Sequence, residues 1–200
     1  MSQHNSSAFA TMKDKLEALA KKPFKPTYMV PNLWTTLEEP APKELSAMPV
    51  HPGEFFLKHL NAVEKKQKQG IDPRRSLNSQ VPGGNGGAWI GQGSIYNLMI
   101  RLSTAFDHNA DGSLGGGKEV SLNPDGVRET GTFLKSIALL GHIKKLGATA
   151  VHLLPVTAIG HDGNKGNLGS PYAIKNPYAI EPSQADPLID MPVEEQFKAF

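Results

Sequence analysis

The chain has 200 residues, a formal net charge of +2 and no cysteine. The lack of cysteine excludes disulfides, iron–sulfur clusters and thiolate zinc sites, and the nearly neutral charge, without an aromatic-laced basic cluster, argues against nucleic-acid binding. No apolar run approaches the ~20 residues that span a bilayer, and the first residues lack the charged-then-apolar layout of a secretory signal, so the sequence favours a cytoplasmic protein without membrane contact.

Residues 1–90 are predicted to form a mostly helical and irregular N-terminal extension. Apolar residues at three- and four-residue steps predict a helix over 8–22. Residues 23–49 are rich in proline and are expected to be extended and irregular. A second helix is predicted over 51–68, and the Pro-Gly-Gly-Asn-Gly-Gly run within 69–93 indicates a linker or loop.

Residues 91–200 are predicted to form an α/β domain. The compact apolar run over 94–102 predicts a buried strand, and so does the run over 150–156. Between them, residues 132–146 show the strongest helix pattern of the chain. A strand, a helix and a strand with a tight return predict two parallel strands with a right-handed crossover.

Capping signals lie at the ends of two predicted helices. Thr130 or Thr132 can cap the start of the helix over 132–146, and Gly147 stands where a left-handed residue ends a helix. A last helix is predicted to begin at Asp190 or Met191. The sequence stops inside this helix, which favours the front part of a longer protein.

A Gly-rich run over 112–118 has the spacing of a phosphate-binding P-loop. The next residue is Glu119, whereas a P-loop needs a hydroxyl for magnesium there, followed at once by a helix. The residues after Glu119 break helices, so a flexible loop is favoured over a nucleotide site.

Oxygen-bearing side chains alternate in the predicted loop after the first strand. Asp107, Asn109 and Asp111 precede Gly112, a pattern that lets a loop curl around a hard cation such as calcium. A full EF-hand is excluded, because Lys118 stands where the loop needs a glutamate. A smaller calcium loop and a metal-free Asx turn both remain open.

Three further side chains are candidates for the site. His152 lies within the predicted second strand and is interpreted as a satisfied core histidine. Tyr172 and Tyr178 flank Ala-Ile-Lys-Asn-Pro in a predicted loop. Aromatic faces suit the C–H groups of sugar rings, and packing within the loop is the alternative.

Residues 94–200 resemble the start of the catalytic barrel of the alpha-amylase family, glycoside hydrolase family 13. The resemblance rests on four landmarks that fall in the family's order: the first barrel strand (94–101), the calcium loop (107–112), the first helix running into the second strand (143–156), and the segment whose tyrosine stacks on the sugar (170–178). The run from 129 to 200 is most similar to bacterial maltosyltransferases.

This resemblance implies an α/β fold: a TIM (β/α)8 barrel, truncated after about two βα units, in a glycoside hydrolase or glucanotransferase. The implied substrate is an α-1,4-linked glucan or maltooligosaccharide, held by Tyr172 and Asn176. Ca2+ is the implied metal, with the ligands Asp107, Asn109, Asp111 and the carbonyl of Ser113.

The resemblance assigns no catalytic residue to this chain, because the family's nucleophile and acid come from later strands. Two other functions remain open. One is a carbohydrate-binding barrel protein without catalysis, and the other is a barrel enzyme that acts on phosphorylated metabolites.

Overall fold

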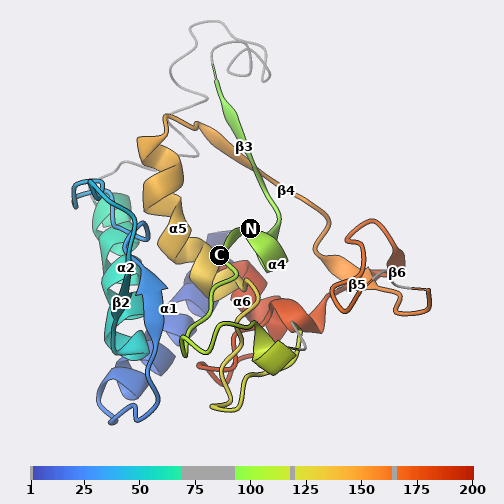
Figure 1. The fold of residues 1–200 in the computed structure, drawn as a ribbon. Helices are drawn as coiled ribbons and strands as arrows, with labels where there is room; N and C mark the ends of the chain where they lie inside the picture. The colour runs from blue at the N-terminus through green and yellow to red at the C-terminus, as the bar shows by residue number, and fades with distance from the viewer. Residues whose placement is uncertain (1, 69–92, 118–119, 164–165) are drawn as a thin grey trace, which may run out of the picture.

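A computed structural model describes residues 2–68, 93–117, 120–163 and 166–200 of the chain (Figure 1). The linker predicted within 69–93 therefore lies almost entirely outside the described residues. The elements in chain order are α1 (Ser2–Ala20), β1 (Met29–Pro31), β2 (Ala47–Pro49), α2 (Pro52–Lys68), β3 (Ile95–Leu98), α4 (Ile100–Ser103), the 3-10 helix η2 (Gly115–Gly117), α5 (Phe133–Lys145), β4 (Ala150–Leu153), β5 (Thr157–Ile159), β6 (Ile174–Ile180), the 3-10 helix η3 (Pro182–Gln184) and α6 (Val193–Ala199).

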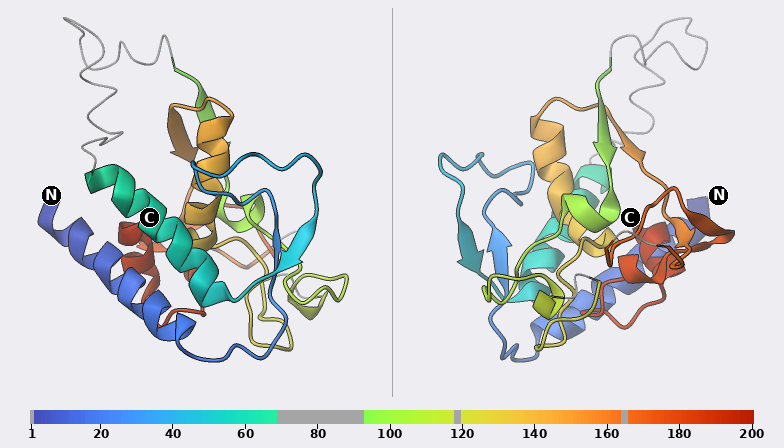
Figure 2. Two further views of the ribbon diagram at one scale, coloured as in Figure 1. Left: turned by 90° about the vertical axis from the view of Figure 1, so that its left-hand side faces the viewer. Right: turned by 45° about the vertical axis from the view of Figure 1, so that its right-hand side comes forward.

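Helices α1 and α2 confirm the two helices predicted in the first third of the chain, and they lie side by side (Figure 2). Leu16 of α1 and Leu60 of α2 are both fully buried. A Cβ at Gly53 would lie 2.6 Å from the backbone nitrogen of Ala20, so glycine allows this close approach. The proline-rich segment between the helices is less irregular than expected, because β1 pairs with β2 in an antiparallel sheet.

The strand–helix–strand unit is present as predicted. β3 and β4 pair in parallel, with Ile95 opposite Ala150 and Leu98 opposite Leu153, and α5 connects them in sequence. Thr132 is the N-cap of α5, and its side chain accepts a hydrogen bond from the Lys135 N–H. Gly147 has a φ of 87°, the left-handed conformation expected after a helix.

Both strands are shorter and more exposed than the sequence predicts. The backbone leaves the strand at Met99, whose N–H donates to the Ser103 hydroxyl of α4 (3.2 Å). Tyr96 and Leu98 pack on the core side of the sheet, but Ile95 on the opposite face is 55% exposed. His152 on the same face is exposed too, so this face of the pair is open and the prediction of a buried strand is wrong.

The predicted last helix exists as α6, but its predicted caps are wrong. Its N-cap is Pro192, which makes no side-chain capping bond, and Asp190 instead lies 3.7 Å from the Lys15 ammonium. The buried amide of Gln196 explains this start. It accepts a hydrogen bond from the Asp186 N–H and donates to the Met191 carbonyl, which fixes the chain just before the helix.

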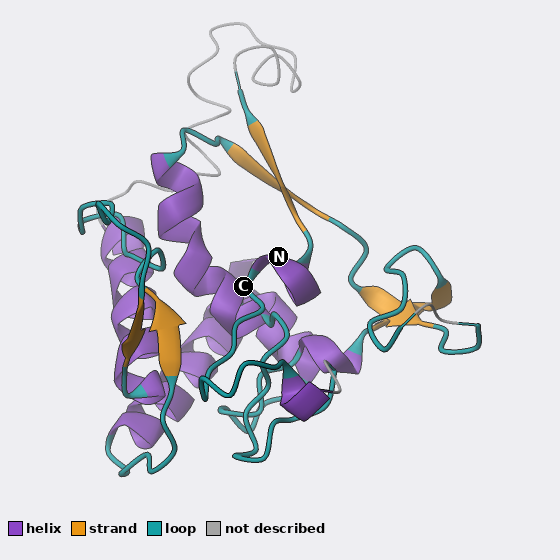
Figure 3. Cartoon of the chain, in the orientation of Figure 1, coloured by secondary structure: helices purple, strands orange, loops and turns teal. Residues whose placement is uncertain are grey.

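One hydrophobic core contains residues from both predicted parts of the chain. Tyr28 and Phe56 of the N-terminal part and Phe133 and Ile189 of the second part are all buried in it. The helices gather around this core, and the β5–β6 hairpin stands apart from them (Figure 3).

Gly141 brings the N-terminal part against the middle of α5. A Cβ at this position would lie 2.1 Å from the Thr35 carbonyl oxygen, so no other residue fits without a shift of the backbone. Next to it, the Lys145 ammonium donates to the Thr35 hydroxyl (2.6 Å).

The described parts of the chain contain three two-stranded sheets, none of which closes into a barrel. A barrel cut after two βα units has too few strands to close, so the fold class stays a prediction. None of the described helices has the length and apolar character needed to cross a membrane.

Candidate functional site

The loop over 107–113 curls as its alternating oxygen side chains predict. The Asp107 carboxylate accepts hydrogen bonds from the N–H groups of Asp111 (3.2 Å) and Gly112 (2.8 Å). The Asn109 side-chain oxygen accepts a second bond from the Asp111 N–H (3.2 Å). Ala110 and Gly112 have positive φ values, of 60° and 85°, which turn the backbone around these oxygens.

The Asp111 carboxylate accepts three hydrogen bonds within this loop. It accepts hydrogen bonds from the N–H and the hydroxyl of Ser113 (2.9 and 2.8 Å) and from the Asn109 amide (3.0 Å). These bonds lower the pKa of its carboxyl, and the bond from the Ser113 hydroxyl has the largest effect.

The residues of this loop meet part of what a calcium ion needs. They offer two carboxylates, one amide oxygen and the Ser113 carbonyl. Both Asp107 oxygens and one Asp111 oxygen keep a lone pair beyond their single hydrogen bonds, whereas the other Asp111 oxygen already accepts two. The described residues hold no group of three or more His, Cys, Asp or Glu side chains that could bind a metal. The calcium site therefore stays a prediction that rests on a small ligand set.

Glu129 organises this loop, and sequence reasoning gave it no role. Its side chain is fully buried. One carboxylate oxygen accepts from the His108 N–H and from the Asn123 amide, both at 2.9 Å, and lies 3.4 Å from the Asn109 nitrogen. The other accepts from the Gly115 N–H at 2.7 Å. Its partners lie up to 21 residues away, so no short motif reveals them.

A buried lysine fixes the backbone on both sides of Glu129. The Lys135 ammonium of α5 donates to the carbonyls of Arg128 and Thr130, the latter at 2.9 Å. Burial lowers the pKa of Lys135 to about 8, and the charge of Asp186 opposes this shift. Lys135 is thus bound to the backbone and has a structural role.

The predicted substrate residues lie on the hairpin that follows β4. Tyr172 precedes β6, and its side chain is 67% exposed; Tyr178 is 97% exposed. Asn176 and Tyr178 lie within β6 and not in a loop, which corrects the sequence-based placement. The Asn176 side-chain oxygen accepts from the Tyr178 N–H (2.9 Å), and its amide nitrogen makes no hydrogen bond within the described residues.

Arg101 links the connection after β3 to the hairpin that follows β4. It lies in α4, just after β3, and is 2% exposed. Its guanidinium donates to the Leu168 carbonyl in the hairpin connection and interacts electrostatically with Glu181. Among the described residues, no hydrogen bond or ion pair joins Tyr172 or Asn176 to the loop over 107–113.

Glu181 anchors the base of the hairpin. Its buried carboxylate accepts hydrogen bonds from the Ile159 N–H (3.2 Å) and from the N–H and hydroxyl of Ser183 (3.3 and 2.8 Å). Burial opposes ionisation, but these bonds and the Arg101 charge outweigh it and lower the pKa of this carboxyl.

His152 is not the core histidine that the sequence predicts. It is exposed on the open face of the β3–β4 sheet, and its Nδ1 lies 2.7 Å from the side-chain oxygen of the facing residue Asn97. The prediction failed because it took the whole strand as covered on both faces.

No known family model matches the chain, and no curated protein matches it in sequence.

Proposed function

We propose that residues 94–200 form the first part of the catalytic barrel of an alpha-amylase-family enzyme, a glycoside hydrolase or glucanotransferase acting on α-1,4-linked glucans. The supporting observation is the parallel β3–β4 pair joined through α5, with a polar connection after each strand. In (β/α)8 barrels the substrate site is built from the connections at the carboxyl ends of the strands. Both sets of candidate residues lie in such connections.

In this proposal Tyr172 is a platform for a sugar ring. Its ring is exposed on the hairpin and has a free face, which a pyranose ring can cover with its axial C–H groups. Asn176 contributes its amide nitrogen, which is free to donate to a sugar hydroxyl. The described residues thus hold substrate, and the proposal assigns bond cleavage to none of them.

Calcium has a supporting role in this proposal. Asp107, Asn109 and Asp111, with the Ser113 carbonyl, would hold the ion, whose charge would stiffen the connection after β3. The lowered pKa of Asp111 keeps one ligand ionised at neutral pH. The chemistry of the sugar bond needs two carboxylates about 5 Å apart in a retaining enzyme, and calcium takes no part in it.

Binding of maltoheptaose tests the proposal. We expect saturable binding to the chain in isothermal titration calorimetry, and the variant Tyr172→Ala should weaken it by about three- to tenfold through loss of stacking. The variant Tyr178→Ala is the matched control, because this tyrosine lies on the same hairpin and is also exposed. Equal affinities in all three proteins would remove Tyr172 from the site.

A turnover assay on a longer protein that contains this chain and the later strands of the proposed barrel separates the enzyme from the carbohydrate-binding alternative. Release or transfer of maltooligosaccharides supports the enzymatic proposal, whereas binding without turnover favours a non-catalytic barrel protein. Calcium is tested independently by thermal unfolding. Millimolar Ca2+ should raise the Tm of the chain and should raise it less in Asp111→Asn, and a chelator-insensitive Tm would contradict the calcium site.

A further inference from the structure

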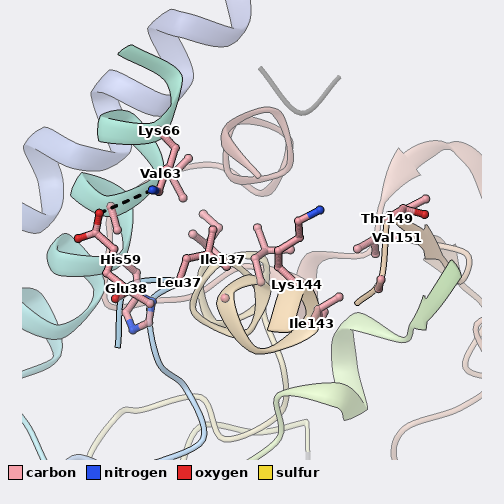
Figure 4. Close-up of a pocket in the computed structure, with 16 residues that line it drawn as sticks. Leu37, Glu38, His59, Val63, Lys66, Ile137, Ile143, Lys144, Thr149 and Val151 are labelled. Carbon is pink, nitrogen blue, oxygen red and sulfur yellow. Dashed lines mark ion pairs between the residues drawn. The ribbon is translucent and has the colours of Figure 1, made fainter. Parts of the chain in front are cut away.

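A second candidate site lies on the other side of α5, away from the hairpin. A cavity of about 380 Å³ separates α2 from α5. Val63 and Lys66 of α2 face it from one side, and Ile137 and Lys144 of α5 line the other (Figure 4). Residues 36–38 and the first residues of β4 line its two ends. Its volume falls in the range of small-molecule sites, roughly 300–1,000 Å³.

The cavity walls are mainly apolar. Leu37, Val63, Ile137, Leu140 and Val151 contribute aliphatic side chains from four separate segments of the chain. An apolar molecule would gain free energy by leaving water for this space. The body of a ligand for this cavity is therefore apolar.

His59 is a buried polar residue in the wall. It is 3% exposed, and its Nε2 has no hydrogen-bond partner. The hydrogen bond between its ring and the Trp34 backbone must therefore use Nδ1. Burial, together with the charge of Lys58, lowers the pKa of His59 to about 4, so the ring is neutral at pH 7. Its Nε2 is then an unpaired acceptor. It is covered in the empty cavity, so a ligand hydroxyl reaches it when a side chain of the wall moves aside.

The rim of the cavity carries an excess of positive charge. The Lys66 ammonium lies 3.8 Å from Glu38, which is also bound to Lys65 at 2.9 Å. Within the described residues, the Lys144 ammonium has neither an ion pair nor a hydrogen bond. An acidic group at the rim would find a free cation there.

We propose that the α2–α5 cavity binds a small amphipathic acid: an apolar body with a hydroxyl that donates to His59 Nε2 and an acidic group that faces Lys144. Aryl or alkyl acids with a distal hydroxyl have this chemistry. The site is separate from the hairpin that carries Tyr172, so it is independent of the proposed glucan site.

The test compares four ligands for the wild-type chain by calorimetry. The full probe is 3-(4-hydroxyphenyl)propionate, and the analogues lack the hydroxyl (3-phenylpropionate), the acid (4-ethylphenol) or both (ethylbenzene). We expect the full probe to bind about tenfold more tightly than 3-phenylpropionate, because only its hydroxyl pairs the buried acceptor. It should also bind several-fold more tightly than 4-ethylphenol.

Three variants assign these differences to residues. His59→Phe keeps a ring in place and should make the full probe and 3-phenylpropionate bind alike. Lys144→Gln should weaken the full probe and leave 4-ethylphenol unchanged. Val63→Trp fills the cavity from a half-buried position and should abolish binding of all ligands. Thermal unfolding of each variant checks that the fold is kept.

The proposal is overturned by three results. These are no saturable binding of any probe, binding that survives Val63→Trp in a folded protein, and equal affinity of the wild type for the full probe and 3-phenylpropionate. Sedimentation provides a further check. If the chain dimerises and Val63→Trp abolishes the dimer, a second copy covers the cavity and the small-molecule proposal is wrong.

Discussion

Buried carboxylates hold the connection after β3 and the connection after β4 to different extents. In the first, the fully buried Glu129 carboxylate accepts hydrogen bonds from the His108 and Gly115 N–H groups and from the Asn123 side chain. In the second, β5 and β6 pair with each other, and Tyr172 and Tyr178 are turned to solvent. Hydrogen bonds to Glu129 fix the backbone at several points of the first connection, whereas those to Glu181 fix only the base of the second, whose exposed tyrosines stay available.

The contrast separates a structural role from a recognition role. When hydrogen bonds within a connection already pair its polar groups, only spare lone pairs remain for a ligand. Exposed aromatic rings of a hairpin contribute little to the stability of the fold, and they can bury a large apolar area when a ligand covers them. Four predictions test this contrast, from the largest expected effect to the smallest.

Removal of the Glu129 carboxylate should have the largest effect. Glu129→Ala leaves the N–H groups of His108 and Gly115 and the Asn123 amide buried without an acceptor. We expect the free energy of unfolding in urea to fall by about 3 kcal/mol.

The matched control is Glu129→Gln. It keeps the shape and one acceptor oxygen, but its amide nitrogen would face the Gly115 N–H, so the loss should be smaller than for alanine. A loss below about 1 kcal/mol in the alanine variant would show that other contacts hold the connection.

Removal of the Arg101 guanidinium should loosen the hairpin more than the first connection. Arg101→Met loses the bond to the Leu168 carbonyl and the charge beside Glu181. We expect amide exchange in β5 and β6 to report a local loss of about 1–2 kcal/mol. Exchange at Gly115 should stay slow, and equal acceleration at both places would mean that the connections unfold as one unit.

Acid should weaken the base of the hairpin through Glu181. The pKa of this carboxyl is lowered in the folded chain, so the unfolded chain takes up a proton first as the pH falls. The stabilisation is complete above about pH 4.5 and is lost as the pH falls through the lower pKa of the folded state. Acid titration of Glu181→Gln, followed by circular dichroism, should show a shallower decline, and identical acid curves would contradict this role.

Truncation of an exposed tyrosine should have the smallest effect. Tyr178 is 97% exposed, so Tyr178→Ala should change the free energy of unfolding by no more than about 0.5 kcal/mol. Tyr172→Ala should change it little as well, although the proposed glucan site predicts that it weakens glucan binding. A large loss of stability in either variant would show that the tyrosines pack and are not reserved for a ligand.

The sequence predicts well what short-range signals control. Thr132 and Gly147 are local capping signals, and the structure has α5 between them. The parallel pairing of β3 with β4 follows from the short return after that helix. The alternating oxygen side chains of the loop that begins at Asp107 also act over a few residues, and they form the expected turn.

Long-range contacts escape such reasoning. Glu129 reaches partners across a loop, and no periodicity marks it. In the sequence His59 is one residue of an ordinary helix. Its unpaired Nε2 can be recognised only once α5 is packed against α2. The exposure of His152 depends on how the whole sheet is built. The apolar pattern of a single strand carries no information about that.

Gly141 makes one wall of the α2–α5 cavity rigid. At this point α5 meets the backbone at Thr35 directly, with no side chain between them. Side chains can change rotamer to admit a larger guest, but two backbones in contact cannot yield in this way. Substitution of Val63 or Leu140 by a smaller residue would enlarge the cavity, and its width at Gly141 would stay the same. The space therefore has one adjustable wall and one fixed wall.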